Sequence, residues 1–248
     1  MDATQLGKGG PRRSLILARL TGNGAFPIET RRMCEVSAEI TGMTGAGMML
    51  MSGDVPRGSI CSTDGVSALI EELQYDLGEG PCVDAYNLDR PVLEPDLAHP
   101  AAGRWLAFRG PAVAGGARAV FGFPLQVGSV RLGALNLYCC RPGNLTDEQH
   151  ADALVMADIA AQAVLVLQAG APPGGLAVEL EECADFHYVV HQASGMVAAQ
   201  LDSSIAQAAI RLRAYAFAVA RPLAAVADDV VARGLRFDAR SGDMERKP

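Results

Sequence analysis

The sequence predicts an α+β protein, with an N-terminal antiparallel sheet flanked by helices and a C-terminal three-helix bundle. Helical and strand patterns alternate up to about residue 168, a Gly- and Pro-rich stretch follows at 170–175, and only helical patterns come after it. We therefore expect folded units at 14–169 and 181–238, a linker with the helix entry at 170–180, and disordered ends at 1–13 and 239–248.

The first part of this unit combines segments with the apolar spacing of helices and segments with that of strands. They are an entry helix at 11–20, a helix at 29–42, strands at 45–54 and 58–65, an amphipathic helix at 66–78 and a short strand at 90–97. Gly78 directly follows the amphipathic helix, at the C-terminal position where a left-handed backbone conformation commonly ends a helix.

A hairpin and a long helix complete this unit. The arms 117–125 and 130–139 flank Gly128-Ser129, a pair suited to a tight primed turn. Proline has no backbone N–H to donate to a neighbouring strand. The arm that contains Pro124 is therefore expected to be an edge strand at that point or to carry a β-bulge. Thr146 and Gln149 have the spacing of a capping box and start a helix that runs to about residue 168.

Two segments, LGEGPCVDA at 77–85 and FPLQVGSVRLGALNLY at 123–138, resemble the GAF domain family of small-molecule sensors. The resemblance covers roughly residues 14–168 and implies a GAF-like sheet with a ligand pocket near the GEGP segment. The implied ligand-binding residues are Gly78, Gly80, Pro81, Cys82 and Trp105. A tight helix-to-helix turn without ligand, and a core role for the tryptophan, remain open readings.

Composition narrows the function classes. The net charge of −7 argues against general nucleic-acid binding, yet residues 203–248 hold eight basic and five acidic side chains. No apolar run of about 18 residues suggests a membrane span. The six cysteines show no framework spacing, which favours reduced thiols in a cytoplasmic protein. Cys82 follows the GEGP turn, where a helix start would lower its thiol pKa.

The second unit contains three Ala-rich helical patterns. On a helical wheel of 188–201, the apolar side chains gather on one face, and Ser194 falls on the opposite edge with Gln192 and Gly195 beside it. The cluster 202–204 is an N-cap signal, and Pro222 suits the first turn of the third helix. Gly234 is expected to end that helix, with Leu235 and Phe237 closing the core.

Three segments in this order resemble the ANTAR family of RNA-binding modules in bacterial transcription antitermination: HQASGMVAAQLD, AAIRLRAYA and RPLAAVADDVV. The resemblance covers about 181–237 and implies an ANTAR-like bundle that binds RNA hairpin loops. The implied RNA-binding residues are Gln192, Ser194, Gly195, Met196, Arg211, Arg213, Tyr215 and Arg221. Members of this family often carry a basic residue where Ser194 stands.

The leading hypothesis is a non-enzymatic, signal-responsive antitermination regulator that acts as a homodimer and needs no cofactor. Its GAF module would sense a small molecule or a partner. Two alternatives stay open: a redox enzyme of the methionine sulfoxide reductase type using Cys82 or Cys139, and a sensor that acts only through protein contacts. Cys183, His187 and His191 share a helical spacing, but no fourth ligand is evident, so we expect no metal site.

Overall fold

The fold is taken from a computed structural model, which describes residues 10–21, 29–52, 55–100, 103–169, 180, 185–186, 188–238 and 245–246. One sheet organises the first unit, in the order β3-β4-β5-β1-β2-β6, and every neighbouring pair is antiparallel. Its strands are β1 (Gly45–Ser52), β2 (Val55–Ser62), β3 (Val92–Glu94), β4 (Ala119–Val127), β5 (Val130–Cys139) and β6 (Asp185–Phe186).

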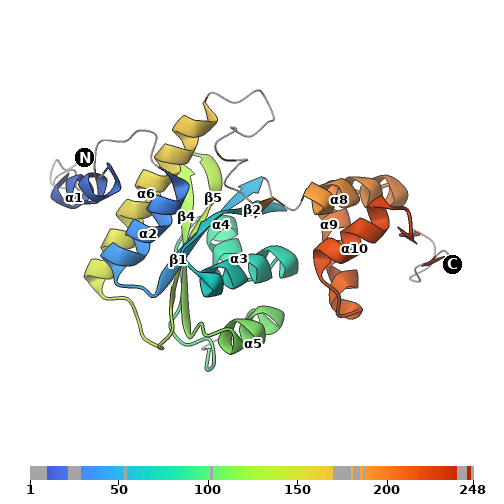
Figure 1. The fold of residues 1–248 in the computed structure, drawn as a ribbon, viewed down its shortest axis with the longest axis horizontal. Coiled ribbons are helices and arrows are strands. Elements are labelled where there is room, and N and C mark those ends of the chain that lie inside the picture. The colour runs from blue at the N-terminus through green and yellow to red at the C-terminus, as the bar shows by residue number, and fades with distance from the viewer. Residues whose placement is uncertain are drawn as a thin grey trace.

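Helices cover both faces of this sheet (Figure 1). On one face lie α2 (Thr30–Thr41) and α6 (Asp147–Gln168), with α1 (Gly10–Thr21) outside them. On the other lie α3 (Gly65–Leu77), α4 (Pro81–Leu88) and α5 (Leu106–Ala114). Each face therefore encloses its own apolar core, one centred on Phe121 and Met156, the other on Phe108 and Ile70.

Several local predictions are confirmed. The hairpin turns at Gly128, whose φ is +60°, and Gly78 caps α3 with a φ of +65°. Thr146 and Gln149 form the predicted capping box at the start of α6. Because β3 pairs only with residues 120–122, β4 borders β5 alone at Pro124 and is an edge there, with a register shift at the next residue.

Long-range contacts correct the predicted boundaries. Helix α1 begins at Gly10 inside the expected disordered start, because Arg12 and Arg13 form ion pairs with Asp152 and Asp158 of α6. The two-residue strands β6 and β8 (Glu245–Arg246) pair with β2 and with β7 (Leu235–Arg236). No strand was expected beyond residue 175, because two residues are too few for a periodic pattern.

The second unit is a bundle of α8 (Tyr188–Leu201), α9 (Ile205–Ala218) and α10 (Leu223–Val231). Ser204 caps α9 through a capping box with Gln207. Leu235 and Phe237 close the core as predicted, whereas Pro222 is the N-cap of α10 and not its first residue. The buried residues of the bundle join Met49, Met51, Tyr75 and Tyr86 of the first unit in one apolar cluster.

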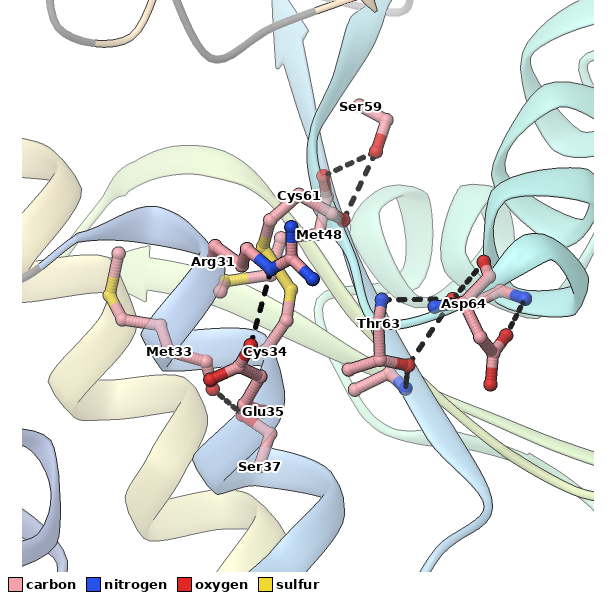
Figure 2. The surroundings of a disulfide bond; sticks show 12 residues. Arg31, Met33, Cys34, Glu35, Ser37, Met48, Ser59, Cys61, Thr63 and Asp64 are labelled. Carbon is pink, nitrogen blue, oxygen red and sulfur yellow. Dashed lines mark hydrogen bonds and ion pairs between the residues drawn. A yellow bond between two sulfur atoms is a disulfide. The ribbon is translucent and has the colours of Figure 1, made fainter.

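A disulfide joins Cys34 of α2 to Cys61 of β2 (Figure 2). The expectation of six reduced thiols is wrong for this pair. The two cysteines are 27 residues apart in the chain, and only the packing of α2 against β2 brings their Cα atoms to 6.4 Å. Chain spacing alone carries no signal of that approach.

Helix α6 is long and apolar enough to cross a membrane by length and composition. Its buried side chains instead form part of the core beneath the sheet, among them Met156, Ala160 and Val164. Among the described residues, no other helix has this length and composition.

Candidate functional site

The contact between the two units centres on Arg213 of α9 and the C-terminal end of α3. The Arg213 Nε donates a hydrogen bond of 3.0 Å to the backbone carbonyl of Tyr75, and the guanidinium carbon lies 5.8 Å from the Tyr75 ring centroid. His191 of α8 meets the same ring edge-on at 6.5 Å. The last carbonyls of a helix lack intrahelical partners and attract cations, so this end of α3 is a natural acceptor for arginine.

Arg213 is largely removed from water by this contact. Burial lowers its pKa, and its Nη2 is buried without a hydrogen-bond partner in the described structure. A Cβ placed on Gly78 would lie 3.4 Å from the Arg213 Cδ, which is ordinary van der Waals contact. Gly78 therefore caps α3 through its positive φ and lies directly against the arginine.

A pocket of about 510 Å³ opens beside this contact. The first unit contributes Leu77, Gly78 and Val83, and the bundle contributes Ile210, Arg213 and Phe217. Ile210 and Phe217 are 64% and 65% exposed, although both are large and apolar. The junction between the units is therefore incompletely packed, in contrast to the bundle core.

The residues predicted to bind RNA do not form one exposed set. Gln192, Gly195 and Arg211 are exposed, and Met196 is half-buried. Ser194 is 2% exposed and its hydroxyl donates to the Val190 carbonyl at 2.8 Å, so its placement on the polar edge of the wheel is corrected. A small hydroxyl that bonds its own helix can be buried at little cost, and the bundle uses that face for packing.

Two further members of that set are already engaged within the bundle. Tyr215 packs edge-on against Phe237, with 5.8 Å between ring centroids. Arg221 pairs with Asp229 at 2.7 Å and donates to the Ala225 carbonyl. Arg211 is thus an exposed arginine, and Tyr215, four residues later on the same helix, is a partly buried ring.

The GEGP segment forms a tight turn from α3 into α4. A Cβ on Gly80 would come within 2.6 Å of Gln74, and a Cβ on Gly122 of β4 would come within 2.4 Å of the Pro81 carbonyl. Pro81 and Cys82 are buried against this strand. The segment therefore packs directly on the sheet at Gly122, which leaves no space for a ligand between them.

Cys82 begins α4 as expected, but its chemistry differs from the prediction. Burial raises the thiol pKa well above its ordinary value, and the nearby Glu71 adds to the rise. Desolvation outweighs the helix N-terminus here because the thiol is 1% exposed. Cys82 is consequently a poor nucleophile in this conformation.

Trp105 lies in the core, 6% exposed, where its indole N–H donates to Asp84 at 3.0 Å. Its ring packs against Phe108, and the guanidinium of Arg104 covers it at 4.3 Å. Of the two readings left open by the sequence, the core reading describes its position.

A buried polar cluster beneath α3 was not predicted from the sequence. Glu71, Gln74 and Asn136 are each at most 2% exposed. In the described structure the Gln74 Nε2 lacks a hydrogen-bond partner, and the Glu71 carboxyl and the Asn136 amide have at most each other. Buried polar groups without partners cost free energy, so such a cluster is an unusual concentration. A glutamate on the apolar stripe of helix 66–78 was its only sequence signal.

No group of three metal-ligating side chains occurs within the described part of the chain. Of the three residues with helical spacing that were considered as metal ligands, Cys183 and His187 lie outside the described residues. The third, His191, packs against Tyr75.

Comparisons with known proteins bear on the first unit. The sequence profile of the GAF domain matches residues 29–165. The fold is similar to the GAF domain of a phosphoenolpyruvate-protein phosphotransferase from Coxiella burnetii, at 16% identity and a TM-score of 0.48, over 64% of this chain and 96% of that one. The corresponding domain from Acinetobacter is similar at 11% identity and a TM-score of 0.44, over 69% and 99%.

A type II free methionine-R-sulfoxide reductase from Thermoplasma acidophilum is also similar in fold. The identity is 14% and the TM-score 0.44, over 61% of this chain and 94% of that one. No curated protein matches the chain.

Proposed function

We propose, from the premise that this chain belongs to the GAF domain family, that it is a sensor whose three-helix module binds RNA hairpin loops and acts in transcription antitermination. The GAF unit receives the signal, from a small molecule or a partner, and the bundle reads RNA. The proposal combines the GAF assignment with the three ANTAR-like segments, which correspond to α8, α9 and α10.

One observation carries the regulatory part of this proposal. Two arginines that are two residues apart on α9 have different surroundings: Arg211 is exposed, and Arg213 is held by the carbonyl of Tyr75. Exposed arginine contacts phosphate and stacks on unpaired bases, whereas a guanidinium bonded to the GAF domain is unavailable to RNA. A signal that moves the end of α3 would release the second arginine.

The redox alternative receives no support from Cys82, which is buried with a raised thiol pKa. The protein-contact alternative predicts that no RNA binds at all. The homodimer, the cytoplasmic location and the lack of enzymatic activity remain parts of the proposal.

A gel-shift assay with paired RNA hairpins bearing hexanucleotide loops tests RNA binding at moderate salt. Arg211→Ala is expected to weaken binding at least about tenfold, since it removes a charged contact to phosphate or base. The control Arg90→Ala removes the same charge from an exposed position of the GAF unit and is expected to change affinity less than about twofold. Equal affinities for wild type and Arg211→Ala would overturn the site assignment.

The double variant Arg211→Ala/Arg213→Ala is expected to abolish binding while circular dichroism shows the helices intact. Crosslinking and sequencing of RNA bound to the wild type, with the Arg211→Ala variant as the comparison, would identify the target.

A further inference from the structure

A second pocket lies beside strand β2 and has a volume of about 450 Å³. Helix α3 contributes Glu71, Glu72 and Tyr75, and β2 contributes Ser59 and Ser62. Arg31 of α2 also lines it, next to the disulfide of Cys34 and Cys61; Figure 2 shows Arg31, Ser59 and this disulfide together. This pocket includes none of the ligand-binding residues predicted from the sequence.

Glu71 is its deepest charged group, because the sheet makes room for the carboxyl at a glycine. Ser62 of β2 and Asn136 of β5 are the cross-strand partners of Gly47 on β1, so the three residues form one row. A Cβ on Gly47 would lie 2.7 Å from the Glu71 Oε1. The carboxyl group therefore lies against Gly47, between the pocket residue Ser62 and the buried Asn136.

The carboxyl group of Glu71 is built into the core without a cationic partner. The side chain is 2% exposed, and among the described residues its oxygens interact only with the side chain of Asn136. A buried acid is normally paired with a cation or with several donors, since its desolvation is otherwise uncompensated. Here the carboxyl lies buried at the wall of the pocket, and a cation that enters would supply the missing counter-charge.

The charge of the lining favours a cation. Among the lining side chains that the structure describes, Glu71 and Glu72 are acidic and Arg31 is basic. The Arg31 guanidinium pairs at 3.2 Å with Glu35, a carboxylate that Arg32 also approaches at 3.6 Å. The described lining therefore offers two carboxyl groups against one guanidinium, and the hydroxyls of Ser59 and Ser62 add acceptors at its wall.

We propose that this pocket binds a small organic cation, an ammonium or amidinium compound, through the carboxylate of Glu71. The inference rests on the proposed sensing role of the GAF domain and is independent of RNA binding. The pocket is also directly connected to the C-terminal bundle, because Tyr75 lines the pocket and its backbone carbonyl accepts the hydrogen bond from Arg213.

Binding is coupled to the release of a proton. Burial raises the pKa of Glu71 to about 8, and the nearby Asn136 side chain lowers it in part. The free protein therefore holds a carboxylic acid at pH 7, and an arriving cation stabilises the carboxylate, so the proton passes to solvent.

The other titratable groups facing this site are Cys82 on α4, Tyr75 and Glu72 on α3, and Arg31 on α2. Cys82 and Tyr75 have pKa values raised by burial, so both stay neutral at pH 7. Glu71 is therefore the group that supplies the proton.

Isothermal titration calorimetry of the full chain with benzamidine, benzamide and benzoate tests the class of ligand, since the three share a ring and differ in charge. Agmatine serves as an extended cationic probe. We expect the two cations to bind at least about tenfold tighter than the two other probes. Titrations in phosphate and in Tris at pH 7 are expected to show release of about half a proton or more per benzamidine.

Glu71→Gln keeps the shape of the side chain and is expected to weaken cation binding at least about thirtyfold and to abolish proton release. Glu148→Gln removes an exposed carboxylate at the start of α6 and is expected to leave both unchanged. Ala68→Phe fills the pocket from the exposed side of α3 and is expected to block the probes without altering the carboxyl group.

Tighter binding of benzamide or benzoate, unchanged cation affinity in Glu71→Gln, or no binding of either cation at millimolar concentration would each overturn the inference. The gel-shift assay of the proposed function is read separately. Cation binding without RNA binding sinks the proposed function alone, and RNA binding without cation binding sinks this inference alone.

Discussion

Arg213 and Tyr75, 138 residues apart in the chain, are joined by a hydrogen bond of 3.0 Å from a guanidinium Nε to a backbone carbonyl. This bond ties the C-terminal bundle to the end of α3. The same α3 helix carries Glu71 one turn earlier, so the buried acid and the contact between the two units share one rigid element.

Arg213→Ala is expected to loosen the bundle from the GAF unit. Hydrogen bonds from charged donors contribute about 1.5–3 kcal/mol, so amide hydrogen exchange at residues 75–78 is expected to accelerate roughly tenfold or more. Arg211→Ala, an exposed neighbour on the same helix, provides the control. Identical exchange at these amides in both variants would show that Arg213 does not hold the units together.

Glu71 is expected to make stability fall as pH rises. Its pKa is about 8 in the fold and 4.5 when exposed, so the folded state binds more protons than the unfolded state between these values. Stability is highest below about pH 4.5, declines toward pH 8 and then levels, with a total loss on the order of 5 kcal/mol from this group.

Urea denaturation from pH 5 to 8.5 measures that decline. The Glu71→Gln variant cannot ionise at this position, so its stability is expected to be nearly flat over the same window. Parallel curves for the two proteins would contradict the assignment of the effect to Glu71.

Gly122→Ala is expected to destabilise the GAF unit by at least about 2 kcal/mol, because the new Cβ would lie 2.4 Å from the Pro81 carbonyl. Backbone cannot move aside as a flexible side chain can. Gly110→Ala in α5 meets open space and is expected to stabilise the protein by about 0.5–1 kcal/mol. Thermal unfolding of both variants decides whether α4 packs on β4 this closely.

Reduction of the Cys34–Cys61 disulfide is expected to cost about 3.5 kcal/mol, since the bond joins residues separated by 27 positions in the unfolded chain. Urea denaturation of Cys34→Ser/Cys61→Ser should match that of the reduced wild type. Cys140→Ser, at an exposed free thiol, should respond to reductant as the wild type does. A double variant as stable as the oxidised protein would rule out this contribution.

Local chemistry accounts for what the sequence determined by itself. A capping box at Thr146, a left-handed cap at Gly78 and a two-residue turn at Gly128 act over a few residues, and each is present where it was expected. The order of helices and strands in the GAF unit and the three helices after it follow from periodicity in the same way.

Tertiary structure decided everything that depends on approach through space. Ser194 and Pro81 became buried, Arg213 was drawn to Tyr75, and Cys34 met Cys61, because surfaces remote in the chain were packed together. The pKa of Glu71 is a property of the same kind. Its rise comes from burial against the sheet at Gly47, which no window of neighbouring residues contains, since desolvation depends on all the atoms that replace water around a group.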